Sequence, residues 1–180
     1  TLFLSELTQQ LSKSGVVIAG GKLTGVACLR DLVSLEDHGA LHTASFLDVG
    51  HPSTALLGEE DLLDTARSVI AELSRHRPDV LLLELGDGVV GHYGTLALLR
   101  HPEIRRIVKL HVFCASDPVG AWGGHRLLAE QEIDIDLFSG PVTDNSVGVD
   151  YLVAELKKPA INAYRDPERL VEIVRKRLGL

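Results

Sequence analysis

The amino-acid sequence predicts an α/β fold with three layers, in which a mostly parallel sheet carries helices on both faces. Short β-branched and apolar runs alternate with helical patterns along the chain, which is typical of parallel strands joined by crossover helices. The chain has 180 residues, of which 45% are hydrophobic. This length and this apolar fraction suffice for one domain with a substantial core.

The first 14 residues precede the alternating pattern. Leu4, Leu7 and Leu11 form part of a helical stripe, and Gly15 ends it. We therefore expect an N-terminal helix or linker over residues 1–14 and a single nucleotide-binding-like α/β domain over residues 15–180. Because the chain begins with Thr1 and contains no methionine, we expect it to be part of a longer protein.

The strands are predicted from short runs of β-branched and apolar residues bounded by turn-forming residues. They are expected at residues 16–19, 43–49, 80–85, 108–114, 137–139 and 160–163.

The helices are predicted between these runs, and two of them have clear start signals. Glu59, Glu60 and Asp61 place negative charge in one first turn, and Asp166 precedes a proline at the first helical position of another. The helices are expected at residues 24–35, 59–74, 95–100, 121–132, 146–156 and 167–178.

Charge and cysteine content exclude several classes of partner. A net charge of −7 argues against nucleic acid or a membrane, because both are bound mainly through basic patches. Cys28 and Cys114 have no C-x-x-C spacing, which favours a reducing compartment. No apolar run approaches the roughly 20 residues that cross a bilayer, so a cytoplasmic location is expected. The expected partner is a small phosphorylated or nucleotide ligand, with homo-oligomerisation left open.

The most informative motif is a glycine-rich segment that follows the first predicted strand. Gly20 and Gly25 have the spacing of a P-loop, G-x-x-x-x-G-K-[ST], but Val26 and Ala27 stand where the lysine and hydroxyl belong. Loop amides and a helix N-terminus attract an anion whatever the side chains are. Phosphoryl transfer also needs a cation and a Mg²⁺ ligand. The motif therefore predicts binding of a phosphate group and puts ATP hydrolysis in doubt.

Three further residues of this segment are candidates for ligand binding. Gly21 continues the glycine turn, and Lys22 and Thr24 could replace the missing cation and hydroxyl. The predicted cofactor-binding set at this loop is Gly20, Gly21, Lys22, Thr24 and Gly25.

Polar residues follow the other predicted strands, at the edge where ligands bind in open α/β sheets. Asp48 could contact Mg²⁺ or a ribose, or it could close a turn. Glu84 directly follows a buried run, where a charge is costly unless it is paired or coordinated. Asp87 lies in the glycine turn after it. We predict Glu84 and Asp87 as catalytic residues, with Asp48 and Glu84 as metal ligands.

The later loops contribute weaker candidates. Asp117 follows the fourth predicted strand, and Asp144 and Asn145 precede a predicted helix. All three are predicted to contact the nucleotide or its base, with helix capping as the alternative for Asp144 and Asn145. The eight histidines show no H-x-x-x-H spacing, which argues against a dedicated zinc site.

The glycine loop, Asp48 and the Glu84-Leu85-Gly86-Asp87-Gly88 segment together resemble P-loop proteins of the dethiobiotin synthetase and cobyrinate-amidase-like group. The resemblance spans residues 16–117 and is one of layout. It implies a P-loop NTPase-like fold, an ATP-like nucleotide with Mg²⁺, and, for an enzyme, ligase or synthetase chemistry. Its strand-two aspartate and its E-G-x-G-G glutamate help to bind Mg²⁺ and substrate, which implicates Asp48 and Glu84. Without the Walker lysine and hydroxyl, the chain would be a pseudoenzyme.

Two alternatives remain open. Gly20, Gly21 and Gly25 open a βα unit and Asp48 lies 23 positions after Gly25, as in a Rossmann-like NAD(P)-dependent oxidoreductase, although the G-x-G-x-x-G spacing is missing. The second alternative is a noncatalytic protein-interaction domain, in which Glu84 and Asp87 are solvated turn residues.

Overall fold

The computed structural model of the chain describes residues 2–180, which divide into two compact units, one up to His101 and one from Pro102. Helix α1 (Leu2–Lys13) belongs to the first unit, where Phe3, Leu7 and Leu11 are buried. The structure therefore draws its boundary at His101, whereas the sequence suggested one at residue 14. The number of independently folding domains stays a prediction.

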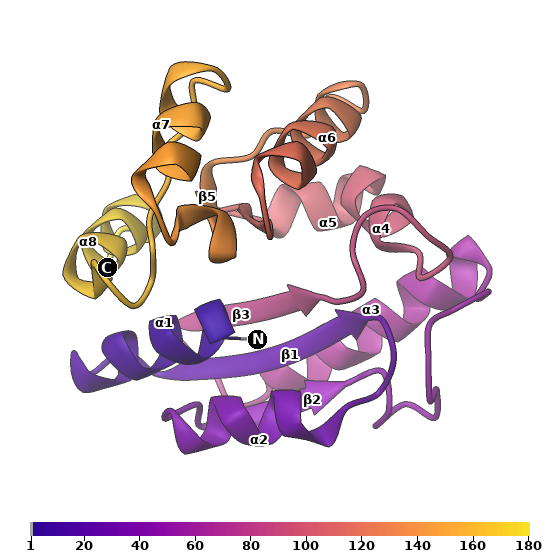
Figure 1. Cartoon of the computed structure of the whole chain (residues 1–180). Helices are drawn as coiled ribbons and strands as arrows, with labels where there is room; N and C mark the ends of the chain where they lie inside the picture. Colours follow the sequence, from indigo (N-terminus) through magenta and orange to yellow (C-terminus); the bar gives the residue numbers. More distant parts are fainter. Residues whose placement is uncertain (1) are drawn as a thin grey trace. The chain divides into compact units, whose positions relative to one another are not determined.

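The first unit is an α/β sandwich built on a parallel sheet (Figure 1). After α1 it contains β1 (Ile18–Thr24), α2 (Leu29–Asp37), β2 (His42–Ser45), α3 (Glu59–Ser74), β3 (Val80–Leu85) and α4 (Thr95–Arg100). Within the described residues of this unit, three strands pair in parallel in the order β2-β1-β3. The predicted α/β class with a parallel sheet is confirmed.

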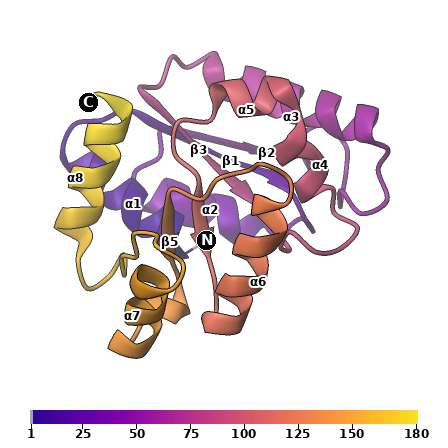
Figure 2. The ribbon, with the colours of Figure 1, turned by 90° about the horizontal axis from the view of Figure 1, so that it is seen from above.

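Two adjacent glycines of β1 show which helix covers which face of the sheet. A Cβ at Gly20 would meet Leu35 of α2, and a Cβ at Gly21 would meet Leu73 of α3. Because successive strand residues point to opposite faces, α2 and α3 cover opposite faces of the sheet, as Figures 1 and 2 show. Since β2 lies on one side of β1 and β3 on the other, the chain reverses direction across the sheet. Ligands in doubly wound folds bind at such a switch point, beyond the carboxyl ends of the strands.

Strand β1 differs from the sequence prediction in a way that matters for function. The predicted strand ended at residue 19 and a loop began at Gly20, but β1 runs from Ile18 to Thr24 and every residue in it is buried. Glycine without a side chain lets α2 and α3 approach the central strand closely on both faces. Gly20 and Gly21 are thus packing residues of a strand, and the predicted loop position of both is wrong.

The second unit is smaller and contains a two-stranded parallel sheet among its described residues. Phe138 of β5 (Leu137–Ser139) is fully buried and packs against Phe113 of β4 (Val112–Cys114) with ring centroids 5.7 Å apart. The elements are α5 (Pro102–Ile107), β4 (Val112–Cys114), α6 (Pro118–Ala129), β5 (Leu137–Ser139), the 3₁₀ turn η1 (Pro141–Thr143), α7 (Ser146–Ala154) and α8 (Pro167–Leu178).

Several predicted boundaries shift where tertiary contacts override the local pattern. Strand β2 ends at Ser45 because the chain turns there and the Asp48 amide donates to the Ser45 carbonyl. Helix α2 begins only at Leu29, after the bend that follows β1. The predicted strand at residues 160–163 is reduced to one bridge, between Ala160 and Phe138. Helix α5 was not predicted.

No helix among residues 2–180 is both long and apolar enough to span a membrane. Cys28 and Cys114 are exposed and form no disulfide. The cytoplasmic location stays a prediction.

An ion pair in the second unit gives a pH-dependent prediction. The hydrogen bond from the Lys158 ammonium holds the pKa of Asp134 below its ordinary value of 3.8. The pair therefore stabilises the fold at pH values above 3.8. This contribution is lost as the pH falls through the lower pKa that Asp134 has in the folded state. Because the Asp134 side chain is 77% exposed, we expect Lys158→Gln to lower the free energy of unfolding by less than about 1 kcal/mol at neutral pH. Urea unfolding of the parent and the variant at neutral and acidic pH measures this difference in free energy. A difference of the same size in acid would contradict the prediction.

Candidate functional site

The candidate site lies where β1 and β3 end and the chain bends away from the sheet. The pairing register shifts between Lys22 and Thr24, and Gly25 then takes a left-handed φ of +115°. Glycine adopts this conformation without the strain that a Cβ would cause. The bend after β1 therefore lies beside the turn after β3, at the switch point of the sheet.

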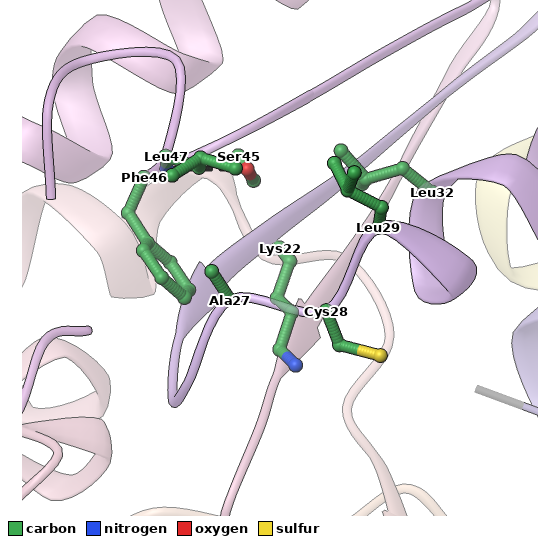
Figure 3. A pocket seen from close by; sticks show the side chains of 8 residues that line it. All are labelled: Lys22, Ala27, Cys28, Leu29, Leu32, Ser45, Phe46 and Leu47. Carbon is green, nitrogen blue, oxygen red and sulfur yellow. Dashed lines mark hydrogen bonds between the residues drawn. The ribbon is translucent and has the colours of Figure 1, made fainter. Parts of the chain in front are cut away.

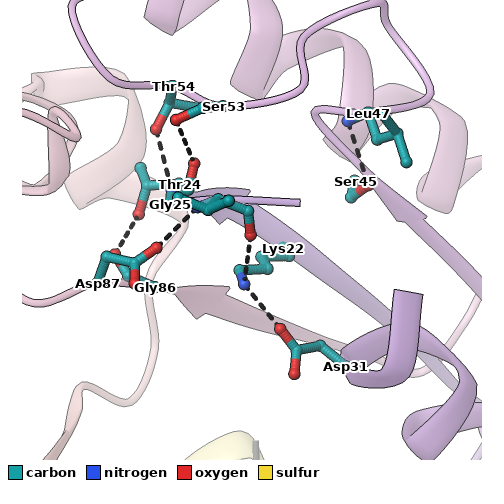
Figure 4. A network of polar contacts seen from close by, with 11 residues as sticks. Lys22, Thr24, Gly25, Asp31, Ser45, Leu47, Ser53, Thr54, Gly86 and Asp87 are labelled. Atoms are coloured by element: carbon teal, nitrogen blue, oxygen red, sulfur yellow. Dashed lines mark hydrogen bonds and ion pairs between the residues drawn. The ribbon is translucent and has the colours of Figure 1, made fainter. Parts of the chain in front are cut away.

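The backbone amides of this bend already have partners within the protein (Figure 4). Gly25 donates to Thr54 Oγ1 at 2.9 Å, Val26 to Asp87 Oδ2 at 2.7 Å, and Ala27 to the Pro52 carbonyl at 3.0 Å. The sequence predicted that amides of residues 20–25 point together at a bound anion. In the structure the anion that contacts the bend is the carboxylate of Asp87, a residue of the same chain.

Asp87 is held in an unusual conformation for this contact. Its φ of +61° is left-handed, a region that aspartate visits more readily than most residues. A Cβ at Gly25 would overlap Asp87 Oδ2. Glycine at position 25 thus permits a negatively charged oxygen to approach the backbone directly.

A buried lysine lies beside the same bend. Lys22 is 7% exposed, and its Nζ lies 2.7 Å from Asp31 Oδ2 and donates to the Val26 carbonyl at 3.0 Å. A Cβ at Gly86 would lie 3.4 Å from the same Nζ. The cation expected near the glycine segment is therefore present, but it comes from a strand and is paired with helix α2.

The side chain of Thr24 is buried and hydrogen-bonded within the protein. It is fully buried, its Oγ1 donates to the Gly86 carbonyl at 3.2 Å, and it lies 3.1 Å from Thr95 Oγ1. Thr54 Oγ1 donates in turn to the Tyr93 carbonyl. These hydroxyls connect β1 with the turn after β3 and with the start of α4, so Thr24 stabilises the bend through buried hydrogen bonds.

Glu84 and Asp48 occupy different surroundings. Glu84 is the Cα partner of Lys22 across the β1–β3 pair, so both side chains project from the same face of the sheet. Asp48 Oδ2 accepts from the Ser45 amide at 2.7 Å and from Ser45 Oγ at 3.3 Å. Asp48 therefore closes its own turn, which is the second of the two roles that the sequence suggested for it. It follows β2, which β1 separates from β3, so the predicted Mg²⁺ ligands come from strands about 9.6 Å apart.

The three remaining predicted residues lie in the second unit and act as caps or turn partners there. Asp117 caps α6 by accepting from the amides of Val119 and Gly120. Asn145 caps α7 through the Gly148 amide. Asp144 accepts from the Asn162 amide group at 2.8 Å. The structure thus supplies the helix-capping explanation for Asp117 and Asn145.

A small hollow opens beside Lys22, at the start of α2 (Figure 3). Its volume is about 10 Å³, room for about one water molecule and far less than the roughly 300–1,000 Å³ typical of ligand pockets. The hollow therefore does not enclose a ligand-sized group. Its walls are formed by Lys22, Ala27, Cys28, Leu29, Leu32, Ser45, Phe46 and Leu47.

Sequence reasoning missed two features of the first unit. Asp31, the partner of Lys22, lies in the first turn of α2 and had no motif that pointed to it. His42, Glu72 and His76 form the second feature, since one possible ligand atom from each lies within 4.8 Å of the others. The helical spacing of Glu72 and His76 was readable, but nothing local connected them with His42.

Comparison with known proteins gives no further guide to the function. No protein-family model matches this chain, and neither the curated proteins nor the solved structures yield a significant match to it.

Proposed function

We propose that the first unit binds a phosphorylated small molecule, such as a nucleotide or a phosphometabolite, at the bend formed by Gly25 and Val26. The observation that carries this proposal is the 2.7 Å hydrogen bond from the Val26 amide to the Asp87 carboxylate. It supports an anion-binding role for the bend, because the carboxylate occupies the position that a phosphate oxygen would take.

Conformation and glycine content support the same proposal. Asp87 is in a left-handed conformation, and such strain often occurs at functional sites. Gly25 lacks the Cβ that would exclude an oxygen from this position. A ligand phosphate would replace the Asp87 carboxylate at the Val26 amide, so Asp87 acts as an internal competitor for the site.

The charged groups beside the bend favour binding over hydrolysis. The buried ammonium of Lys22 donates a hydrogen bond to the carbonyl of Val26, the residue whose amide binds Asp87. Val26 and Ala27 supply neither the cation nor the hydroxyl of an intact P-loop. We therefore propose that the unit is a P-loop-like pseudoenzyme. Glu84, the strand partner of Lys22, is the proposed Mg²⁺ ligand, because Mg²⁺ sites need only one or two carboxylates.

The size of the hollow bears on where a ligand would bind. Its volume of about 10 Å³ is far below that of a ligand pocket, so a bound phosphate group would lie at the open surface of the bend and not inside the hollow. Inorganic phosphate, pyrophosphate, ATP and NAD⁺ are therefore separate arms of the test, each with and without Mg²⁺.

The decisive variant is Asp87→Asn, which keeps the shape of the side chain and removes its charge. We expect phosphate or pyrophosphate to bind this variant at least about tenfold more tightly than the parent, because a charge-assisted hydrogen bond contributes about 1.5–3 kcal/mol. Isothermal titration calorimetry measures the affinity, and thermal unfolding with each ligand supports it.

Asp48→Asn is the matched control. It removes another exposed carboxylate that accepts from a backbone amide at 2.7 Å, but in its own turn, so phosphate affinity without Mg²⁺ should not change. If neither the parent nor Asp87→Asn binds any of the four ligands, the proposal is wrong.

A noncatalytic interaction domain is the second candidate, and exposed apolar side chains on α2 favour it. Leu29 is 66% exposed and Val33 is 49% exposed, one helical turn apart, and Leu47 is also exposed near the same hollow. Failure of every ligand arm would favour this candidate over phosphate binding.

A further inference from the structure

The structure assigns a site for a divalent transition metal to His42, Glu72 and His76 of the first unit. His42 is the first residue of β2, Glu72 lies in the last turn of α3, and His76 follows that helix. The site lies at the amino end of β2, so it is separate from the bend beyond the carboxyl ends of β1 and β3.

The distances between the three side chains suit one ion. Possible ligand atoms of all three lie within 4.8 Å of one another. His42 Nε2 and Glu72 Oε1 are 3.8 Å apart, which is too long for a hydrogen bond. Two ligands at zinc bond lengths of about 2.0–2.1 Å around a tetrahedral ion lie about 3.3 Å apart. Small rotations of the side chains would therefore complete the coordination.

The two rings are already neighbours. The His42 and His76 rings lie with centroids 4.0 Å apart and are tilted by 37°, so they contact each other and would rotate about their side-chain bonds to direct one nitrogen each at a common ion. Glu72 lies in the last turn of α3, and His76 lies in the turn that follows the helix. The end of α3 and the turn after it supply two ligands, and β2 supplies the third.

The surroundings favour a cation at this position. The carboxyl end of α3 carries the negative end of the helix dipole. Arg75 bonds Glu72 Oε2 at 2.6 Å and leaves Oε1 directed toward His42. Arg75 therefore orients the carboxylate, as outer partners of metal ligands commonly do.

Two imidazoles and one carboxylate are the donor set of zinc sites that keep one position for water. His76 is exposed and His42 and Glu72 are half-buried, so the fourth position faces solvent. The ion would be Zn²⁺, or Co²⁺ or Ni²⁺ in its place, and it would connect the end of α3 with the start of β2.

The test uses the untagged full chain with Cys28→Ser and Cys114→Ser, because exposed thiols would compete for zinc. We expect this background to bind one equivalent of Zn²⁺ in calorimetry. Its Co²⁺ form should show visible absorption without a thiolate charge-transfer band.

His76→Ala should weaken Zn²⁺ binding at least tenfold, since even outer partners of metal ligands contribute about 10–100-fold. The matched control is His92→Ala, which removes another exposed histidine of the same unit and should leave the affinity unchanged. His76 is exposed, so its removal should not unfold the chain, and Glu72→Gln provides a second test with the same expected loss. A background protein that binds no Zn²⁺, or a His76→Ala variant that binds as tightly as the background, would overturn the assignment.

Discussion

Asp31→Asn should lower the free energy of unfolding by about 3–5 kcal/mol, because removing one partner leaves a buried charge without compensation. Asp31 and Lys22 are both less than a tenth exposed, and their charged atoms lie 2.7 Å apart. The variant would leave the Lys22 ammonium buried between the sheet and α2. Urea unfolding followed by circular dichroism measures the change.

Two controls separate this effect from a general loss of charge. Asp64→Asn disrupts an exposed pair with Arg67 and should cost less than about 1 kcal/mol. The double variant Lys22→Met with Asp31→Leu should recover most of the stability, since apolar residues can replace a buried ion pair. An Asp31→Asn variant as stable as the Asp64→Asn control would show that the buried pair does not stabilise the fold.

The second large effect is expected from Gly148→Ala at the start of α7. A Cβ at Gly148 would overlap the backbone carbonyl oxygen of Val142 in η1, and backbone cannot rotate away as a side chain can. The helix would have to move from its cap at Asn145, whose side chain accepts from the Gly148 amide. We expect a loss of about 3 kcal/mol or more, at the upper end of the range for overpacking.

Gly123→Ala is the matched control for this substitution. Gly123 lies within α6, and a Cβ there would meet nothing within 4 Å. The control should gain up to about 1 kcal/mol, because alanine is the better helix former. Fluorescence of Trp122, the only tryptophan of the chain and also in α6, follows urea unfolding of the second unit. Equal stability of the two variants would contradict the predicted overlap.

Local patterns predicted the elements whose signals lie within one segment. The apolar run at residues 80–85 is β3, the acidic first turn at Glu59 begins α3, and Gly179 ends α8 with a left-handed φ of +74°. Hydrophobic periodicity and capping act between residues a few positions apart, so the sequence displays them directly.

The glycine segment shows where this reasoning reaches its limit. Gly20 and Gly21 suit a phosphate loop and also suit a central strand covered by helices on both sides. The sequence alone does not distinguish a phosphate loop from a central strand here, because the difference lies in whether Leu35 and Leu73 pack against the two glycines. Leu35 lies 15 positions after Gly20 and Leu73 lies 52 positions after Gly21, and only the folded chain brings them to the strand.

By itself, the sequence determined the α/β class, the order of its main elements and the edge of the sheet where polar loops gather. The tertiary structure decided which of these polar groups meet: Val26 with Asp87, Lys22 with Asp31, and His42 with Glu72 and His76. The reason is physical. Periodicity and caps depend on neighbours along the chain, whereas these pairings depend on strand register and on the face of the sheet that each crossover helix covers.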